Sequence, residues 1–162
     1  MDKLVLVSPA KIGDTLIATP AIRAWRRAHS RGELTVCCPP ASPAHDVLLG
    51  NPYIDSLRIA TADEASALPG EHVVLDPGVA LDAAWRNGRP FAWNFGRMLG
   101  VEIDSLRYDF AITELERREG EAACRELGLG RPVVVVARHS ASCESNVPAI
   151  RRANKCIDNF YW

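Results

Sequence analysis

The amino-acid sequence predicts an α/β fold with a mainly parallel sheet, and three observations support this prediction. Short continuous runs of apolar, β-branched residues recur along the chain, as in strands that are buried on both faces. Segments with the apolar spacing of amphipathic helices separate these runs. The 162 residues include 48% apolar and 24% charged residues, the balance of a globular protein. Alternation of strands with helices then favours a parallel sheet.

The first strand is expected over residues 4–7, and a helix follows the loop at 8–14. One face of that helix is apolar, at spacings of four, four and three positions. Pro20 lies within it and leaves two alternatives. Either the helix bends at Pro20, or Thr19 caps a second helix that has Pro20 in its first turn. The apolar positions are Ile17, Ala21, Trp25 and Ala28.

The same alternation continues along the chain. Further strands are expected over 34–38, 54–59, 72–75 and 108–112. Helices are expected over 44–49, over two parts of 79–99 that residues 87–90 separate, and over 114–127, where Thr113 is the predicted N-cap.

A change of domain is expected near residue 130. The glycine- and proline-containing stretch 128–132 is the best candidate for a linker, and residues 133–137 after it are the strongest strand signal in the chain. A strand buried on both faces needs neighbouring strands and covering helices, which residues 138–162 cannot supply. This strand therefore either joins the first sheet or opens a second domain. We expect a domain over 1–130, followed by the start of an incomplete domain over 131–162.

Charge and hydropathy argue against several classes of protein. Nineteen basic side chains nearly balance twenty acidic ones, for a net charge of -1, whereas general nucleic-acid binding needs a basic face. No stretch approaches the ~18 uncharged apolar residues of a transmembrane helix. The N-terminus lacks the pattern of a signal peptide. We therefore expect a cytoplasmic protein with at most peripheral contact with a membrane.

The five cysteines are odd in number and none belongs to a Cys-x-x-Cys pair, so we expect reduced thiols. Cys37 and Cys38 are adjacent in an expected strand, which directs their side chains to opposite faces. His139, Cys143 and Cys156 could supply three ligands of a zinc site, but a fourth ligand is not evident. Free thiols and a loop histidine are the better interpretation, and we expect no metal site.

The loop after the first strand is the most informative place, because ligands bind beyond the carboxyl ends of strands in open α/β sheets. Gly13 permits close approach of the backbone, and the helix start after it favours an anion. Two roles are open for the Asp14 side chain. It caps the helix, or its carboxylate faces the cleft as a general base. Asp76 lies at the end of a later strand, and we expect it either to contact a ligand or to cap a turn. The glycine patterns of dinucleotide and Gly-Lys-Ser/Thr phosphate loops are absent.

Two segments carry a resemblance to a known family. Residues 4–28 combine a strand, a loop that ends in Gly13-Asp14, and a helix with the pattern Thr-Pro-x-hydrophobic-Arg. Residues 51–55 follow the pattern Asn-Pro-x-hydrophobic-Asp. With these motifs the chain resembles the bacterial heptosyltransferases, glycosyltransferase family 9. The loop form Ser8-Pro9-Ala10 most resembles the branch that adds the second heptose to lipopolysaccharide.

The resemblance implies the N-terminal half of a GT-B glycosyltransferase, in which two Rossmann-like domains face a cleft. It implies transfer of a sugar, heptose in this branch, from an ADP-sugar to a lipopolysaccharide-core-like acceptor, which is a glycolipid or an oligosaccharide. Such transfer inverts the anomeric centre and needs no metal and no cofactor apart from the nucleotide-sugar donor. The enzyme would act in the cytoplasm, at the inner face of the inner membrane, without a nucleic-acid partner.

The same resemblance implies site residues. Asp14 matches the catalytic base, which deprotonates the acceptor hydroxyl as it attacks the anomeric carbon. Ile157-Asp158 stands where the family has a Trp-Pro pair. The alternative to an enzyme is a non-catalytic α/β binding module that recognises a sugar or phosphate ligand. The acceptor side is expected to include Lys11, Gly13, Thr15 and Asp76, and the donor side Ser140, Ser142 and Lys155.

Overall fold

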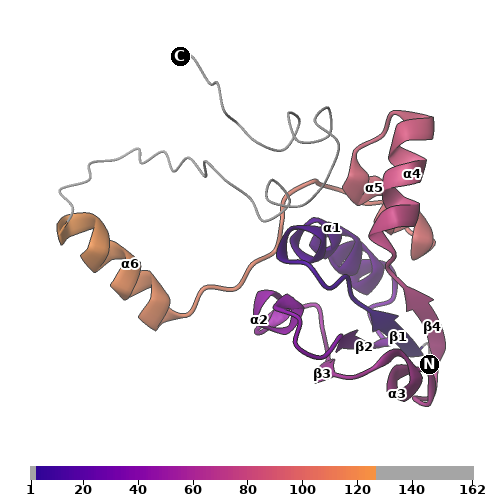
Figure 1. The fold of residues 1–162 in the computed structure, drawn as a ribbon, viewed down its shortest axis with the longest axis horizontal. Helices are drawn as coiled ribbons and strands as arrows, with labels where there is room; N and C mark the ends of the chain where they lie inside the picture. Colours follow the sequence, from indigo (N-terminus) through magenta and orange to yellow (C-terminus); the bar gives the residue numbers. More distant parts are fainter. Residues whose placement is uncertain (1–2, 127–162) are drawn as a thin grey trace. The chain divides into compact units, whose positions relative to one another are not determined.

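Four parallel strands form the sheet, hydrogen-bonded in the order β3-β2-β1-β4 (Figure 1). A computed structural model describes residues 3–126 of the chain. The predicted α/β fold with a parallel sheet and flanking helices is confirmed. The strands are β1 (Lys3–Val7), β2 (Glu33–Cys38), β3 (Ser56–Ile59) and β4 (Glu71–Val74). The helices are α1 (Ile12–Ala28), α2 (Ala44–Leu48), α3 (Ala62–Ser66), α4 (Pro77–Asn87), α5 (Phe91–Met98) and α6 (Glu114–Glu126).

The described residues belong to two bodies, each of which is considered by itself. The first body ends at Ile112 and holds the sheet with helices α1 to α5. The second body begins at Thr113, and its described part includes α6. The predicted boundary at residue 130 and the predicted strand over 133–137 lie outside the described residues.

The two faces of the sheet carry separate apolar clusters. One face packs against α1, α2 and α5, and the other packs against the short helix α3. Cys38 belongs to the first cluster and Cys37 to the second, which confirms that these adjacent side chains point in opposite directions. The first cluster includes Leu4, Leu6, Leu34 and Val36 of the sheet with Ala18, Ile22 and Trp25 of α1; the second includes Val5, Ala60 and Ala65.

Helix α1 continues through Pro20, so the alternative in which Thr19 caps a second helix is wrong. Pro20 has no N–H to donate to the carbonyl of Leu16 four residues earlier. The Thr19 hydroxyl donates to that carbonyl instead, with 2.8 Å between the two oxygens. Thr19 Oγ1 also accepts the backbone N–H of Asp109 at 2.9 Å. The threonine therefore compensates for the proline and ties a distant segment to the helix.

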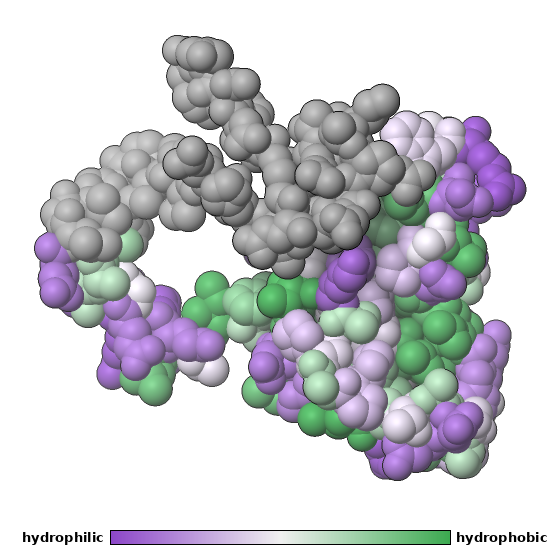
Figure 2. Space-filling view, viewed as in Figure 1, coloured by the Kyte–Doolittle hydropathy of each residue, from purple (hydrophilic) through white to green (hydrophobic). Residues whose placement is uncertain are grey.

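The strand expected over 108–112 is wrong, because these residues pair with no strand of the described sheet. The segment instead bonds to α1, through Thr19 and through the buried guanidinium of Arg23, which pairs with Asp109. Its alternating apolar side chains face solvent. Figure 2 shows green surface along the visible part of this segment. The exposed side chains of this segment are Tyr108, Phe110 and Ile112.

Capping boxes open both α3 and α6. The predicted cap of α6 is confirmed: Thr113 Oγ1 accepts the N–H of Glu116 at 3.2 Å, and the Glu116 carboxylate accepts the N–H of Thr113 at 2.7 Å. The same reciprocal bonds join Thr61 and Glu64 at the start of α3, a helix that we did not expect from the sequence. The Thr-x-x-Glu spacing at this position is the sequence signal that identifies it.

Candidate functional site

The candidate site lies at the edge of the sheet where β1, β2 and β4 end. The backbone ladder continues past the strands, because Ser8 N–H donates to the Cys37 carbonyl at 2.9 Å and Leu75 N–H donates to the Val7 carbonyl at 3.0 Å. Ser42 Oγ, in the loop after β2, donates to the Ala10 carbonyl at 2.6 Å. These bonds hold the three loops together at the carboxyl edge.

The strand order places a topological switch point at this edge. From β1 the chain adds β2 and then β3 on one side, and it returns to add β4 on the other side of β1. In open α/β sheets, ligands bind in the crevice where the strand order reverses. Helix α1 follows β1 and helix α4 follows β4, so the N-termini of both helices begin at the switch point (Figure 1).

Asp14 is the third residue of α1, and its side chain is partly exposed. Lys11 occupies the N-cap position and makes no side-chain hydrogen bond to the helix. The alternative in which Asp14 caps the helix is therefore wrong. Within residues 3–126, the Asp14 carboxylate makes no hydrogen bond and no ion pair. Its place in the first turn puts it at the positive end of the helix dipole.

The residues next to Asp14 divide into exposed and buried positions. Lys11 and Gly13 are exposed, and a Cβ at Gly13 would meet nothing within 4 Å. Thr15 is fully buried, with its Oγ1 at 2.9 Å from the carbonyl oxygens of both Pro9 and Lys11. The Thr15 hydroxyl therefore holds the loop after β1, and in this conformation it is turned away from a ligand that approaches from solvent.

Asp76 is the N-cap of α4. Its Oδ1 accepts the N–H groups of Gly78 at 2.7 Å and Val79 at 3.3 Å, and the residue is exposed. The capping alternative is therefore confirmed. Contact between Asp76 and an acceptor stays a prediction, since these two bonds engage only one of the two carboxylate oxygens.

The remaining candidates supply no further chemistry in the described part of the chain. Within residues 3–126, no group of three or more His, Cys, Asp or Glu side chains could hold a metal ion. Burial raises the pKa of the Cys37 and Cys38 thiols, which disfavours a nucleophilic thiolate at either position. The predicted donor residues Ser140, Ser142 and Lys155 and the alternative zinc ligands His139, Cys143 and Cys156 lie outside the described residues.

Arg23, the arginine of the Thr-Pro-x-hydrophobic-Arg pattern, is buried against a distant segment of the chain. Its guanidinium pairs with Asp104 and Asp109 and donates to the carbonyls of Ser105 and Arg107, each at 2.9 Å. These partners lie more than 80 residues away along the chain, so no local pattern could report them. Arg23 positions the helix that presents Asp14 and does not itself lie in its first turn.

Solved structures that resemble this chain include two glycosyltransferases. The crystal structure of the glycosyl transferase family 9 from Veillonella parvula DSM 2008 is similar over 82% of this chain and 51% of its own, with a TM-score of 0.59 and 15% sequence identity. The structure of E. coli ADP-heptose lps heptosyltransferase II is similar over 80% of this chain and 51% of its own, with a TM-score of 0.51 and 12% identity. The chain spans about half the length of each of these proteins.

These likenesses establish the fold alone, because sequence identities this low carry no information about substrate or activity. No protein-family model matches the sequence, and no curated protein matches it. None of the helices within residues 3–126 is long and apolar enough to cross a membrane.

Proposed function

We propose that this chain is the acceptor-side half of a GT-B glycosyltransferase of the heptosyltransferase type. The enzyme would transfer a sugar, heptose by resemblance, from an ADP-sugar to a lipopolysaccharide-core-like acceptor. One observation carries the proposal: a partly exposed carboxylate, Asp14, stands in the first turn of α1 at the switch point of a sheet whose fold is similar to that of two glycosyltransferases.

The chemistry needs a base at this position. The Asp14 carboxylate accepts the proton of an acceptor hydroxyl while the hydroxyl oxygen forms a bond to the anomeric carbon of the donor. The bond between that carbon and the donor phosphate breaks in the same step, and the nucleoside diphosphate leaves with the electron pair. A single displacement of this kind inverts the anomeric centre. The proposed mechanism assigns no role to a metal ion or to a cofactor.

The neighbouring residues support binding of the acceptor. Lys11 is an exposed cation three residues before Asp14. Gly13 has no side chain and leaves open space at this turn of the helix. The first N–H groups of α1 receive no side-chain cap and favour a phosphate or hydroxyl oxygen. We assign Lys11, Gly13 and Asp76 to the acceptor side, and Thr15 to the support of their loop.

The second candidate is a non-catalytic module that binds a sugar or phosphate ligand. The helix N-terminus without a side-chain cap favours it, because such a terminus binds an anion whether or not a base lies beside it. The two candidates differ in what Asp14 does: an enzyme needs its basicity, whereas a binding module needs at most its hydrogen bonds.

The test is Asp14→Asn in the complete protein that contains this chain, assayed for transfer from an ADP-sugar to a lipopolysaccharide-core acceptor. Asparagine keeps the size of the side chain and removes the base, so the rate should fall by about 10²–10⁴-fold. Acceptor affinity and the unfolding midpoint should stay close to those of the unaltered protein. Asp46→Asn, at an exposed carboxylate on α2, is the matched control and should leave the rate unchanged. Transfer by Asp14→Asn at the original rate would exclude the catalytic role and favour the binding module.

A further inference from the structure

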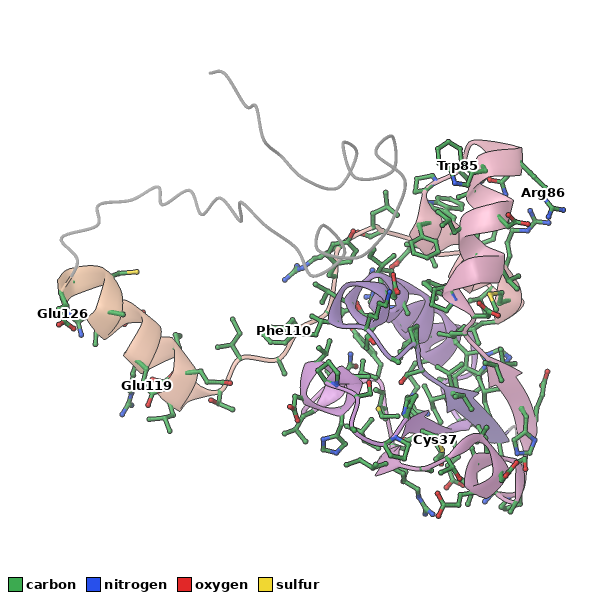
Figure 3. All side chains as sticks on the ribbon, viewed as in Figure 1. Cys37, Trp85, Arg86, Phe110, Glu119 and Glu126 are labelled. Atoms are coloured by element: carbon green, nitrogen blue, oxygen red, sulfur yellow. The ribbon has the colours of Figure 1, made fainter. Side chains whose placement is uncertain are left out.

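The tip of the hairpin formed by α4 and α5, residues 85–93, carries features that the proposed transfer reaction does not use. Trp85 is 78% exposed, the largest exposed fraction among the large hydrophobic side chains of the described residues. Figure 3 shows Trp85 and Arg86 projecting from the end of α4 that lies away from the sheet. A tryptophan exposed to this degree buries little apolar surface within its own fold, so packing in the first body does not explain it.

Three arginines lie on the same helical hairpin as this tryptophan. Arg86 and Arg89 lie on the tip, and Arg97 of α5 lines a shallow hollow together with Arg86. Over α4 and α5, the only carboxylate is Asp82, which pairs with Arg86 at 2.5 Å. Three arginines against one aspartate give the hairpin a charge of +2 in a chain of net charge -1. The hairpin is therefore cationic, whereas the rest of the chain carries a net negative charge.

Internal bonds fix the shape of the tip. Gly88 ends α4 in the left-handed region, at a φ of 65°, and donates its N–H to the Ala84 carbonyl. The Asn87 side-chain amide donates to Asn94 Oδ1 at 2.9 Å, which joins the two helices. The guanidinium of Arg89 lies 5.1 Å from the centre of the Trp93 ring. These bonds hold the aromatic and cationic groups in a defined turn between α4 and α5.

We propose that this tip docks on the surface of a lipid bilayer that contains anionic lipids. Tryptophan is enriched at the headgroup level of membranes, and each arginine near an anionic surface adds favourable electrostatic energy. Charge complementarity selects an anionic surface, because residues 85–93 hold no carboxylate and, within the described residues, Arg89 is in no ion pair. A second copy of the chain fits less well, since a stable protein interface buries about 800 Å² on each partner and the tip exposes only a few side chains. The docking does not depend on sugar transfer.

Vesicle co-sedimentation of the 162-residue chain tests this inference. The chain should bind vesicles of phosphatidylethanolamine with phosphatidylglycerol, bind phosphatidylcholine vesicles much more weakly, and dissociate as salt is added. Trp85→Ala should weaken the partition to anionic vesicles by about tenfold. Arg89→Gln should weaken it by about fivefold. Because both side chains are exposed, neither variant should change the unfolding midpoint.

Matched controls come from β3. Ile59→Ala and Arg58→Gln remove an exposed apolar side chain and an exposed arginine on another part of the first body, and both should bind vesicles as the unaltered chain does. Absence of binding to anionic vesicles, equal binding to neutral ones, or equal loss in the β3 variants would each overturn the inference. So would self-association in sedimentation velocity that Trp85→Ala abolishes, because that result would assign the tip to a second copy. A transfer assay plays no part in this experiment, so it can fail or succeed independently of the proposed function.

Discussion

Arg23 shows how a single buried charge organises the first body. Its side chain is only 5% exposed, and it bonds to two carboxylates and two backbone carbonyls in the segment 104–109. The Asp109 carboxylate is itself 17% exposed, so it depends on this guanidinium in place of water. Arg27, one turn further along α1, also pairs with Asp104 but is 58% exposed. The two arginines therefore offer a direct comparison of a buried and an exposed ion pair that share a carboxylate.

We expect Arg23→Gln to lower the free energy of unfolding by about 3 kcal/mol, because it leaves a poorly hydrated carboxylate without its partner. Arg27→Gln should lower it by less than about 1 kcal/mol, since water screens the exposed pair. Urea denaturation of both variants measures the difference. Equal losses in the two variants would show that burial of Arg23 does not determine the strength of its contacts.

Part of the candidate site could be predicted from the sequence because it depends on position along a strand. Asp14 follows β1 and Asp76 follows β4, and both were expected at the carboxyl edge for that reason. Whether a carboxylate caps a helix depends on the residue at which the helix begins. Helix α1 begins at Ile12, which makes Lys11 the N-cap, although lysine is not a favoured residue there. The sequence contains no signal for this start, and it therefore left the role of Asp14 open.

At the scale of the element, helix α1 depends on the side chain that precedes its proline. Thr19 Oγ1 donates to the Leu16 carbonyl that Pro20 cannot serve, and it accepts the N–H of Asp109. Thr19→Val keeps the shape of the side chain but leaves both backbone groups without these bonds in a buried place. We expect a loss of about 2–3 kcal/mol in the free energy of unfolding. Thr19→Ser keeps the hydroxyl and should lose only about 1 kcal/mol, for the buried methyl group. Thermal or urea unfolding checks this order, and a serine variant less stable than the valine variant would contradict it.

The start of α4 combines a structural role with a proposed binding role in one residue, and two substitutions separate them. Asp76→Ala removes the cap and should cost about 1 kcal/mol, whereas Asp76→Asn keeps a cap of similar strength and should cost only a few tenths. If the carboxylate also contacts the acceptor, Asp76→Asn should weaken acceptor binding by roughly tenfold while stability is preserved. Calorimetric titration with a lipopolysaccharide-core oligosaccharide measures the affinity. Asp82→Asn on the same helix is the control, and unchanged affinity in Asp76→Asn would leave the residue with its capping role alone.

The sequence predicts best those elements whose apolar pattern has one possible physical cause, such as burial of both faces of a strand. Continuous apolar runs become β1 and β2 because both faces of these strands are buried. The alternating run at 108–112 has the spacing of a strand, but its backbone bonds to α1 and its apolar residues remain exposed. Alternation reports only that one side of a segment differs from the other, and it does not identify the partner. The short helix α3 depends on a local capping box and has almost no apolar periodicity to reveal it.

At the scale of the whole molecule, the chain spans about half of two glycosyltransferase structures, and all the described candidate residues belong to one body. Lys11, Gly13, Asp14 and Asp76 are proposed to bind and activate the acceptor. The predicted donor residues Ser140, Ser142 and Lys155 belong to the expected start of a second domain. The two substrates should therefore differ in how well the 162-residue chain binds them.

We expect this chain to bind a lipopolysaccharide-core oligosaccharide, to bind an ADP-sugar weakly or not at all, and to show little or no transfer. The physical reason is positional: transfer requires that both reactants be held within a few tenths of a nanometre of each other, in line, and a single lobe orients only one of them. Isothermal titration calorimetry with each substrate, followed by an assay of transfer with both, makes the measurement. Asp14→Asn should bind the oligosaccharide about as well as the unaltered chain, because the base acts on the reacting hydroxyl and adds little to ground-state affinity. Tight donor binding without acceptor binding would reverse the assignment of the two sides, and rapid transfer by this chain would show that one lobe can orient both substrates.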